Sequence, residues 1–146
     1  MKNLSPPLVA ALLFALCGGL AAASMQFTLT EFAVESGVNR WVFVAVPGLF
    51  AALFALFVYQ SADKHVKTIG QSLSRGLLVA LLSWFAVSAL ATAVWFPIGD
   101  FFAWLSTVLL ISGVVGGGPM LLAALVAGAL TGWIVRQRSA AWILKS

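Results

Sequence analysis

The sequence predicts an all-α integral membrane protein, with four transmembrane helices in a single membrane domain over residues 1–146. Hydrophobic residues make up 62% of the 146 residues and charged residues only 8%, so the chain has too few polar groups to cover a soluble globule. Apolar runs long enough to cross a bilayer recur along the chain. They define four predicted spans, at residues 8–23, 41–60, 76–96 and 113–135.

The first span, 8–23, follows Pro6 and Pro7, where missing N–H groups cost little because a helix start leaves them unpaired. It carries small residues at every fourth position, a pattern that predicts close packing against a second helix in lipid. Its members are Ala11, Ala15, Gly19 and Ala23. One alternative stays open, in which Lys2, this apolar run and the Ala-x-Ala pattern before Ser24 form a cleaved signal peptide.

The second span, 41–60, has an aromatic residue near each end. Trp41 and Tyr59 are both predicted to anchor the helix at the membrane interface. Pro47 and Gly48 lie inside the span and predict a local kink. The polar connection before it, residues 25–40, is predicted to form a short amphipathic segment on the outer side of the membrane.

Residues 61–75 form the most basic connection of the chain, with Lys64, Lys67 and Arg75. Short loops rich in Lys and Arg remain in the cytoplasm, so the positive-inside rule makes this segment a cytoplasmic linker. The basic carboxyl end, after residue 135, is assigned to the same side. Both termini are therefore expected in the cytoplasm, the number of spans is even, and the chain is expected to be a multi-pass protein of a bacterial-type inner membrane.

The longest apolar run, residues 101–135, contains no charged residue. As a helix it would extend about 52 Å, against a hydrocarbon core of about 30 Å. The stretch 113–120 is predicted to interrupt it, because glycine weakens a helix and proline lacks an N–H and clashes with the preceding turn. Since an even number of spans is required, residues 101–111 are expected to lie at the outer interface or to enter the membrane as a re-entrant segment.

The two halves of the chain show a weak internal similarity. The nine residues from Pro47 match the nine from Pro119 at six positions, with an offset of 72 residues. Shorter matches occur upstream at offsets of 70 and 69. A two-fold internal repeat is therefore a hypothesis, although alanine and leucine produce such patterns readily. In such a repeat both halves have the same orientation, so their pseudo-axis runs along the membrane normal.

The chemistry of the predicted spans is poor in reactive groups. Their interiors lack ionisable side chains, which argues against an ion-coupled pump formed by one chain. Cys17 is the only cysteine and His65 the only histidine, so no metal and no cofactor is expected. Ser83 and Ser112 are available as nucleophiles, but no base is predicted at their depth, so an enzyme is not expected. A lipid-modifying enzyme remains as the least favoured alternative.

The leading functional expectation is a non-enzymatic subunit or helix-packing partner in a membrane complex or homo-oligomer. It depends on a second small-residue stripe on the last span. The members of that stripe are Ala124, Gly128 and Gly132. The expected partners are membrane lipids, and other membrane subunits or copies of the same chain. Because the basic residues are spread along the chain, nucleic acid is not expected as a partner.

The alternative function is a small channel or transporter. Matching Gly/Pro interruptions in two halves of a membrane protein are typical of a transporter's binding site. The pathway is then expected near the interruptions in the second and fourth spans. The candidate binding residues are Pro47, Gly48, Gly116, Gly117, Gly118 and Pro119.

Overall fold

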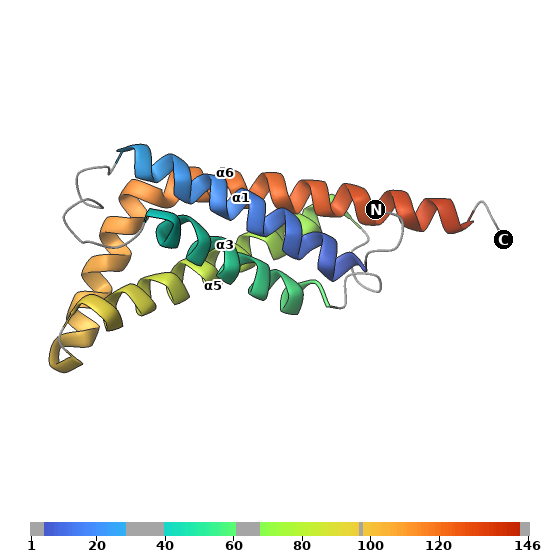
Figure 1. The fold of residues 1–146 in the computed structure, drawn as a ribbon. Coiled ribbons are helices and arrows are strands. Elements are labelled where there is room, and N and C mark those ends of the chain that lie inside the picture. The colour runs from blue at the N-terminus through green and yellow to red at the C-terminus, as the bar shows by residue number, and fades with distance from the viewer. Residues whose placement is uncertain (1–4, 29–39, 61–67, 97, 144–146) are drawn as a thin grey trace.

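Four long helices make up almost all of the described protein (Figure 1). The computed structural model describes residues 5–28, 40–60, 68–96 and 98–143, so most of the predicted outer segment at 25–40 lies outside the described residues. Each helix contains a stretch long and apolar enough to span a membrane, and no strand occurs in the described ranges, so the predicted fold class is confirmed. The elements are α1 (Pro6–Thr28), α3 (Arg40–Val58), α5 (Ile69–Trp95), the 3-10 helix η1 (Ile98–Asp100) and α6 (Phe101–Ile143).

The helices form a ring in which each packs against the next, from α1 through α3, α5 and α6 back to α1. The described chain begins and ends at one side of this bundle, which we call the terminal end (Figure 1). It holds the start of α1, the end of α3, the start of α5 and the last part of α6, and the opposite side is the distal end. Any up-and-down four-helix bundle has this neighbour order, so the internal repeat stays a hypothesis.

Helix α5 begins at Ile69, earlier than the predicted start of the third span at residue 76. Thr68 and Gln71 form a capping box there. The Thr68 hydroxyl accepts a hydrogen bond from Gln71 N at 3.3 Å, and Thr68 N donates to Gln71 Oε1 at 3.4 Å. These bonds satisfy two N–H groups that a helix start leaves unpaired. The second half of the predicted linker is therefore helical, and Arg75 belongs to the third membrane helix.

Helix α6 bends where the sequence predicts a break. It continues without interruption over its 43 residues, and it changes direction sharply in its first half, so that its first part crosses the distal end of the bundle (Figure 1). The prediction of an interruption at 113–120 is wrong in this respect. Pro119 removes a single helical hydrogen bond, whereas a full break within a membrane leaves several backbone groups unpaired. A bent helix therefore costs less free energy than a broken one.

The predicted stripe on the first span lies in the contact of α1 with α3. A Cβ atom added at Gly48 would lie 3.0 Å from Ala15 O and 3.7 Å from Gly19 Cα. Such close backbone approach requires small residues on both helices. On the same helix Ala11 is buried and Ala23 is half-buried. Gly18 belongs to this contact as well, because its own added Cβ would lie 3.2 Å from Ala51 Cβ, and the predicted stripe omitted it.

The predicted stripe on the last span lies in the contact of α6 with α5. A Cβ atom added at Gly128 would lie 3.1 Å from Ser72 O, and one added at Gly132 would lie 2.8 Å from Ser72 Cβ. Ala124 and Gly76 meet in the same contact, since a Cβ at Gly76 would lie 2.9 Å from Ala124 O. The chain's own helices therefore occupy both stripes.

Tyr59 closes the core at the terminal end. Its side chain is fully buried, and its hydroxyl donates to Ser72 O at 2.7 Å, while Ser72 Oγ donates to Gly128 O at 2.7 Å. These bonds connect α3, α5 and α6. The prediction that Tyr59 anchors the helix at the membrane interface is therefore wrong, because the hydroxyl finds its partners inside the bundle. Trp41, at the other end of α3, is 76% exposed, as an interfacial anchor requires.

Candidate functional site

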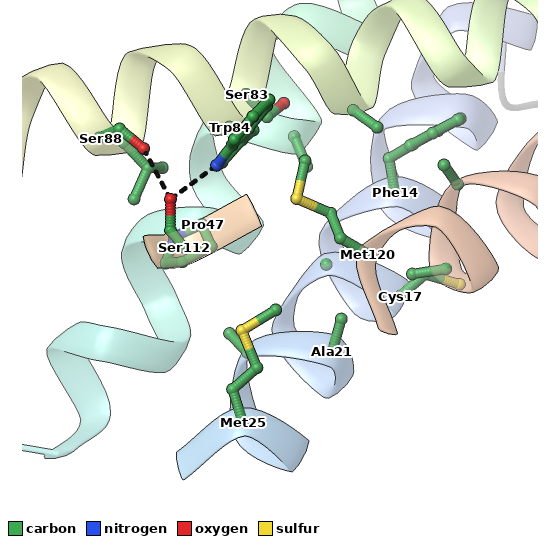
Figure 2. Close-up of a pocket in the computed structure, with 17 residues that line it drawn as sticks. Phe14, Cys17, Ala21, Met25, Pro47, Ser83, Trp84, Ser88, Ser112 and Met120 are labelled. Atoms are coloured by element: carbon green, nitrogen blue, oxygen red, sulfur yellow. Dashed lines mark hydrogen bonds between the residues drawn. The ribbon is translucent and has the colours of Figure 1, made fainter. Parts of the chain in front are cut away.

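A cavity of about 150 Å³ lies between the helices, and all four helices line it (Figure 2). Its wall is mostly apolar. The residues that matter for its chemistry are Phe14, Cys17, Ala21 and Met25 on α1, Pro47 on α3, Ser83, Trp84 and Ser88 on α5, and Ser112 and Met120 on α6. A cavity of this volume holds a molecule about the size of benzene.

One wall of the cavity carries a small polar cluster. The Trp84 indole Nε1 donates to Ser112 Oγ at 2.8 Å, and Ser88 Oγ lies 3.5 Å from Ser112 Oγ (Figure 2). Ser112 Oγ also donates to Leu109 O at 3.3 Å. A hydroxyl proton can rotate toward another acceptor, so Ser88 or Ser112 can donate one hydrogen bond to a ligand in the cavity.

The polar cluster depends on the start of the glycine-rich stretch. A Cβ atom added at Gly113 would lie 3.1 Å from Trp84 Cζ2, so a small residue is needed where the indole packs against α6.

One turn earlier on α5, Val79 and Ala80 are buried, and the Ser83 hydroxyl donates to Val79 O at 2.7 Å. Because its proton is used within the helix, Ser83 presents acceptor lone pairs to the cavity.

Two methionines line the cavity from neighbouring helices, Met25 on α1 and Met120 on α6 (Figure 2). Met25 packs directly against the bend of α6, because a Cβ atom added at Gly116 would lie 2.5 Å from Met25 Cε. Methionine is flexible and fills irregular apolar spaces. These side chains can therefore repack around ligands of different shapes without movement of the backbone.

The structure brings only part of the predicted binding set to this cavity. Pro47 lines it, and Gly116 contacts the lining residue Met25. Gly48 packs against α1 instead, and Cβ atoms added at Gly117 or Gly118 would meet nothing within 4 Å. The last member of the set, Pro119, is half-buried inside α6.

The lining residues Met25, Trp84 and Ser88 were not predicted. Trp84 and Ser88 are one helical turn apart, which is a weak signal for a shared face. Nothing in the sequence shows that this face meets Ser112. Hydroxyl, indole and thioether groups without a charged side chain suit a neutral, mainly apolar ligand.

The nucleophile chemistry of the site is limited. The described residues that line the cavity carry three serine hydroxyls and one thiol, but no carboxylate, amine, guanidinium or imidazole. A hydroxyl needs a neighbouring base to act as a nucleophile. The hydroxyl and thiol groups of these described residues are suited to hydrogen bonds with a ligand. Comparison of the chain with models of protein families, with curated proteins and with solved structures found no match.

Proposed function

We propose that this chain is a small non-enzymatic membrane protein that binds a neutral, mainly apolar molecule between its helices and acts as a small transporter. The cavity beside Pro47 and Met120 carries this proposal. It adjoins the contact of Met25 with Gly116 at the bend of α6. In many transporters interrupted helices form the substrate site near the middle of the membrane, and hinges lie at a few positions that absorb changes in backbone angles, so the bend supplies a candidate hinge.

The direction of the bundle in the membrane belongs to the same proposal. The terminal end faces the cytoplasm of a bacterial-type inner membrane, because α3 ends, α5 begins and α6 ends on that side, and the sequence is rich in Lys and Arg between α3 and α5 and at the carboxyl end. Packing of Phe14 against Tyr59, whose ring centroids are 5.9 Å apart, supports a bundle that is closed at the cytoplasmic side. The ligand then enters from the distal end or from the outer half of the bilayer.

Cys17 provides a direct test, because it is the only cysteine and it lines the cavity. In detergent, phenol is expected to slow the reaction of Cys17 with N-ethylmaleimide, whereas benzenesulfonate at the same concentration leaves the rate unchanged. The two probes share one ring, but the charged probe pays a large desolvation cost in an apolar cavity. Equal protection by both probes, or by neither, would contradict the proposed ligand class.

A second candidate function, as a subunit of a homo-oligomer or membrane complex, is favoured by one observation on α6. Pro119 has no N–H for the carbonyl of Val115, and the Val115 side chain is 41% exposed. Next to it, Cβ atoms at Gly117 and Gly118 would meet nothing within 4 Å. An unpaired carbonyl in hydrocarbon costs free energy, so a donor side chain from a partner helix would stabilise this face.

Cysteine cross-linking tests the second candidate. With Cys17 replaced by serine, oxidation of Gly118→Cys in native membranes is expected to give a covalent dimer if two copies pack at this face. Ala93→Cys is the matched control, because Ala93 is also exposed but lies on α5. Equal cross-linking of the two variants would indicate random collision and would exclude packing at the bend.

A further inference from the structure

Arg75 is a half-buried cation without a complete set of partners among the described residues. It lies in the second turn of α5, in a helix otherwise apolar enough to span a membrane. Its Nη1 atom is buried and has no hydrogen-bond partner among the described residues. A buried donor on a charged group costs much free energy when it lacks an acceptor. An acceptor is therefore expected to come from outside the described chain.

Among the described residues, the neighbours of Arg75 do not supply a counter-charge. Its positive charge lies close enough to act on the phenol of Tyr59. The Tyr59 hydroxyl already donates to Ser72 O, and a neutral phenol does not balance a cation. The only carboxylate in the described ranges is that of Asp100, which precedes α6 at the distal end.

The position of Arg75 on α5 points to a ligand from the membrane. At 100° per residue, Arg75 lies between the face of buried Ser72 and Val79 and the face of Leu78 and Leu82, which are 47% and 38% exposed. Helix side chains lean toward the helix N-terminus. From about 9 Å inside the start of α5, the guanidinium therefore reaches back toward the membrane surface at the terminal end.

We propose that Arg75 binds the phosphate of an anionic membrane phospholipid at the flank of α5 that faces α3. A phosphodiester offers acceptor oxygens whose spacing matches the forked guanidinium, so one lipid can accept from Nη1 and from a second N–H group. The acyl chains of the same lipid lie along the exposed leucines of α5. The site is separate from the cavity and does not depend on the proposed transport function.

Native mass spectrometry of the full chain tests this site. With equal amounts of phosphatidylglycerol and phosphatidylcholine, the wild-type protein is expected to retain phosphatidylglycerol preferentially, and Arg75→Gln is expected to reduce that preference about tenfold. Arg136→Gln removes the same charge from an exposed position on α6 and should keep most of the preference. Arg75→Lys preserves the charge without the fork, so an intermediate preference is expected.

Four results would overturn the proposal. Equal loss in Arg75→Gln and Arg136→Gln would indicate general charge attraction, and a wild type without preference would exclude the site. Inorganic phosphate that displaces phosphatidylglycerol at equal concentration would indicate a free anion as the ligand. Asp63 lies outside the described residues, and Asp63→Asn offers the remaining control. If Asp63→Asn increases phosphatidylglycerol retention and Arg75→Gln abolishes that increase, the chain's own carboxylate is the natural partner of Arg75.

Discussion

Replacement of Gly76 by leucine is expected to destabilise the bundle by about 3 kcal/mol or more, the upper part of the range for overpacked cores. A Cβ atom at this position would lie 2.9 Å from Ala124 O, 3.2 Å from Gly128 Cα and 3.3 Å from Phe14 Cζ. The first two are backbone atoms, which cannot rotate away as a flexible side chain can. Helices α5 and α6 must therefore separate, and the bond from Ser72 Oγ to Gly128 O is lost with their contact.

The control for this prediction is Gly118→Leu. A Cβ atom at Gly118 would meet nothing within 4 Å, so leucine is expected to change the stability by about 1 kcal/mol or less, with helix propensity as the main contribution. Unfolding of both variants by SDS, followed by circular dichroism, gives the comparison. Similar midpoints for the two variants would show that α5 and α6 do not depend on close contact at Gly76.

The sequence predicts only part of the packing between α5 and α6. Small residues at every fourth position identified Gly128 and Gly132 as a packing face, since periodicity defines one side of a helix. It did not identify Gly76 as the partner, although Ser72, Gly76 and Ala80 recur at the same spacing and are all buried, because the predicted span began at residue 76 and left Ser72 in the linker. The period of small residues predicts which side of a helix is buried, but only the structure shows which helix packs against that side.

Helix ends and helix bends are also predicted only in part from the sequence. Hydropathy predicted four spans, but the start of α5 depends on the capping box of Thr68 and Gln71, which hydropathy does not detect. Glycine and proline predicted a disturbance in the longest run, and whether it became a break or a bend depended on the cost of unpaired backbone groups in a membrane. The burial of Tyr59 was missed for a related reason, because an aromatic residue at the end of a span is equally typical of an interface.

The cavity could not be predicted from the sequence at all. Its polar cluster joins Trp84 and Ser88 on α5 to Ser112 on α6. Residues so far apart in the sequence form no short motif, so the sequence does not show that they meet. The candidate residues chosen from the sequence were selected because they disturb helices. Pro47 lines the cavity, whereas Gly117 and Gly118 lie outside it, so substitutions at these two glycines are poor tests of ligand binding.

Substitution of Ala123 by leucine is expected to abolish ligand binding in the cavity and to leave the fold intact. Ala123 lines the cavity from α6 and is half-buried, so the longer side chain enters a space of about 150 Å³ that lies among apolar groups. Phenol protection of Cys17, measured as the ratio of alkylation rates with and without phenol, is expected to weaken at least about tenfold, since a filled cavity excludes the probe. The ratio cancels any direct shielding of the thiol by the new side chain.

The stability of Ala123→Leu distinguishes a filled cavity from a disrupted fold. Filling a void commonly stabilises a protein by about 0.5–2 kcal/mol, so Ala123→Leu is expected to keep or raise the SDS midpoint, in contrast to Gly76→Leu. Ala93→Leu adds the same atoms to an exposed position on α5 and should alter neither protection nor stability. Undiminished protection in Ala123→Leu would mean that phenol reaches Cys17 by another route, and the transporter proposal would then lose the cavity that carries it. Lost protection together with a lowered midpoint would instead mean that the space is already filled by repacking of Met25 and Met120, since overpacking, unlike the filling of a void, destabilises a core.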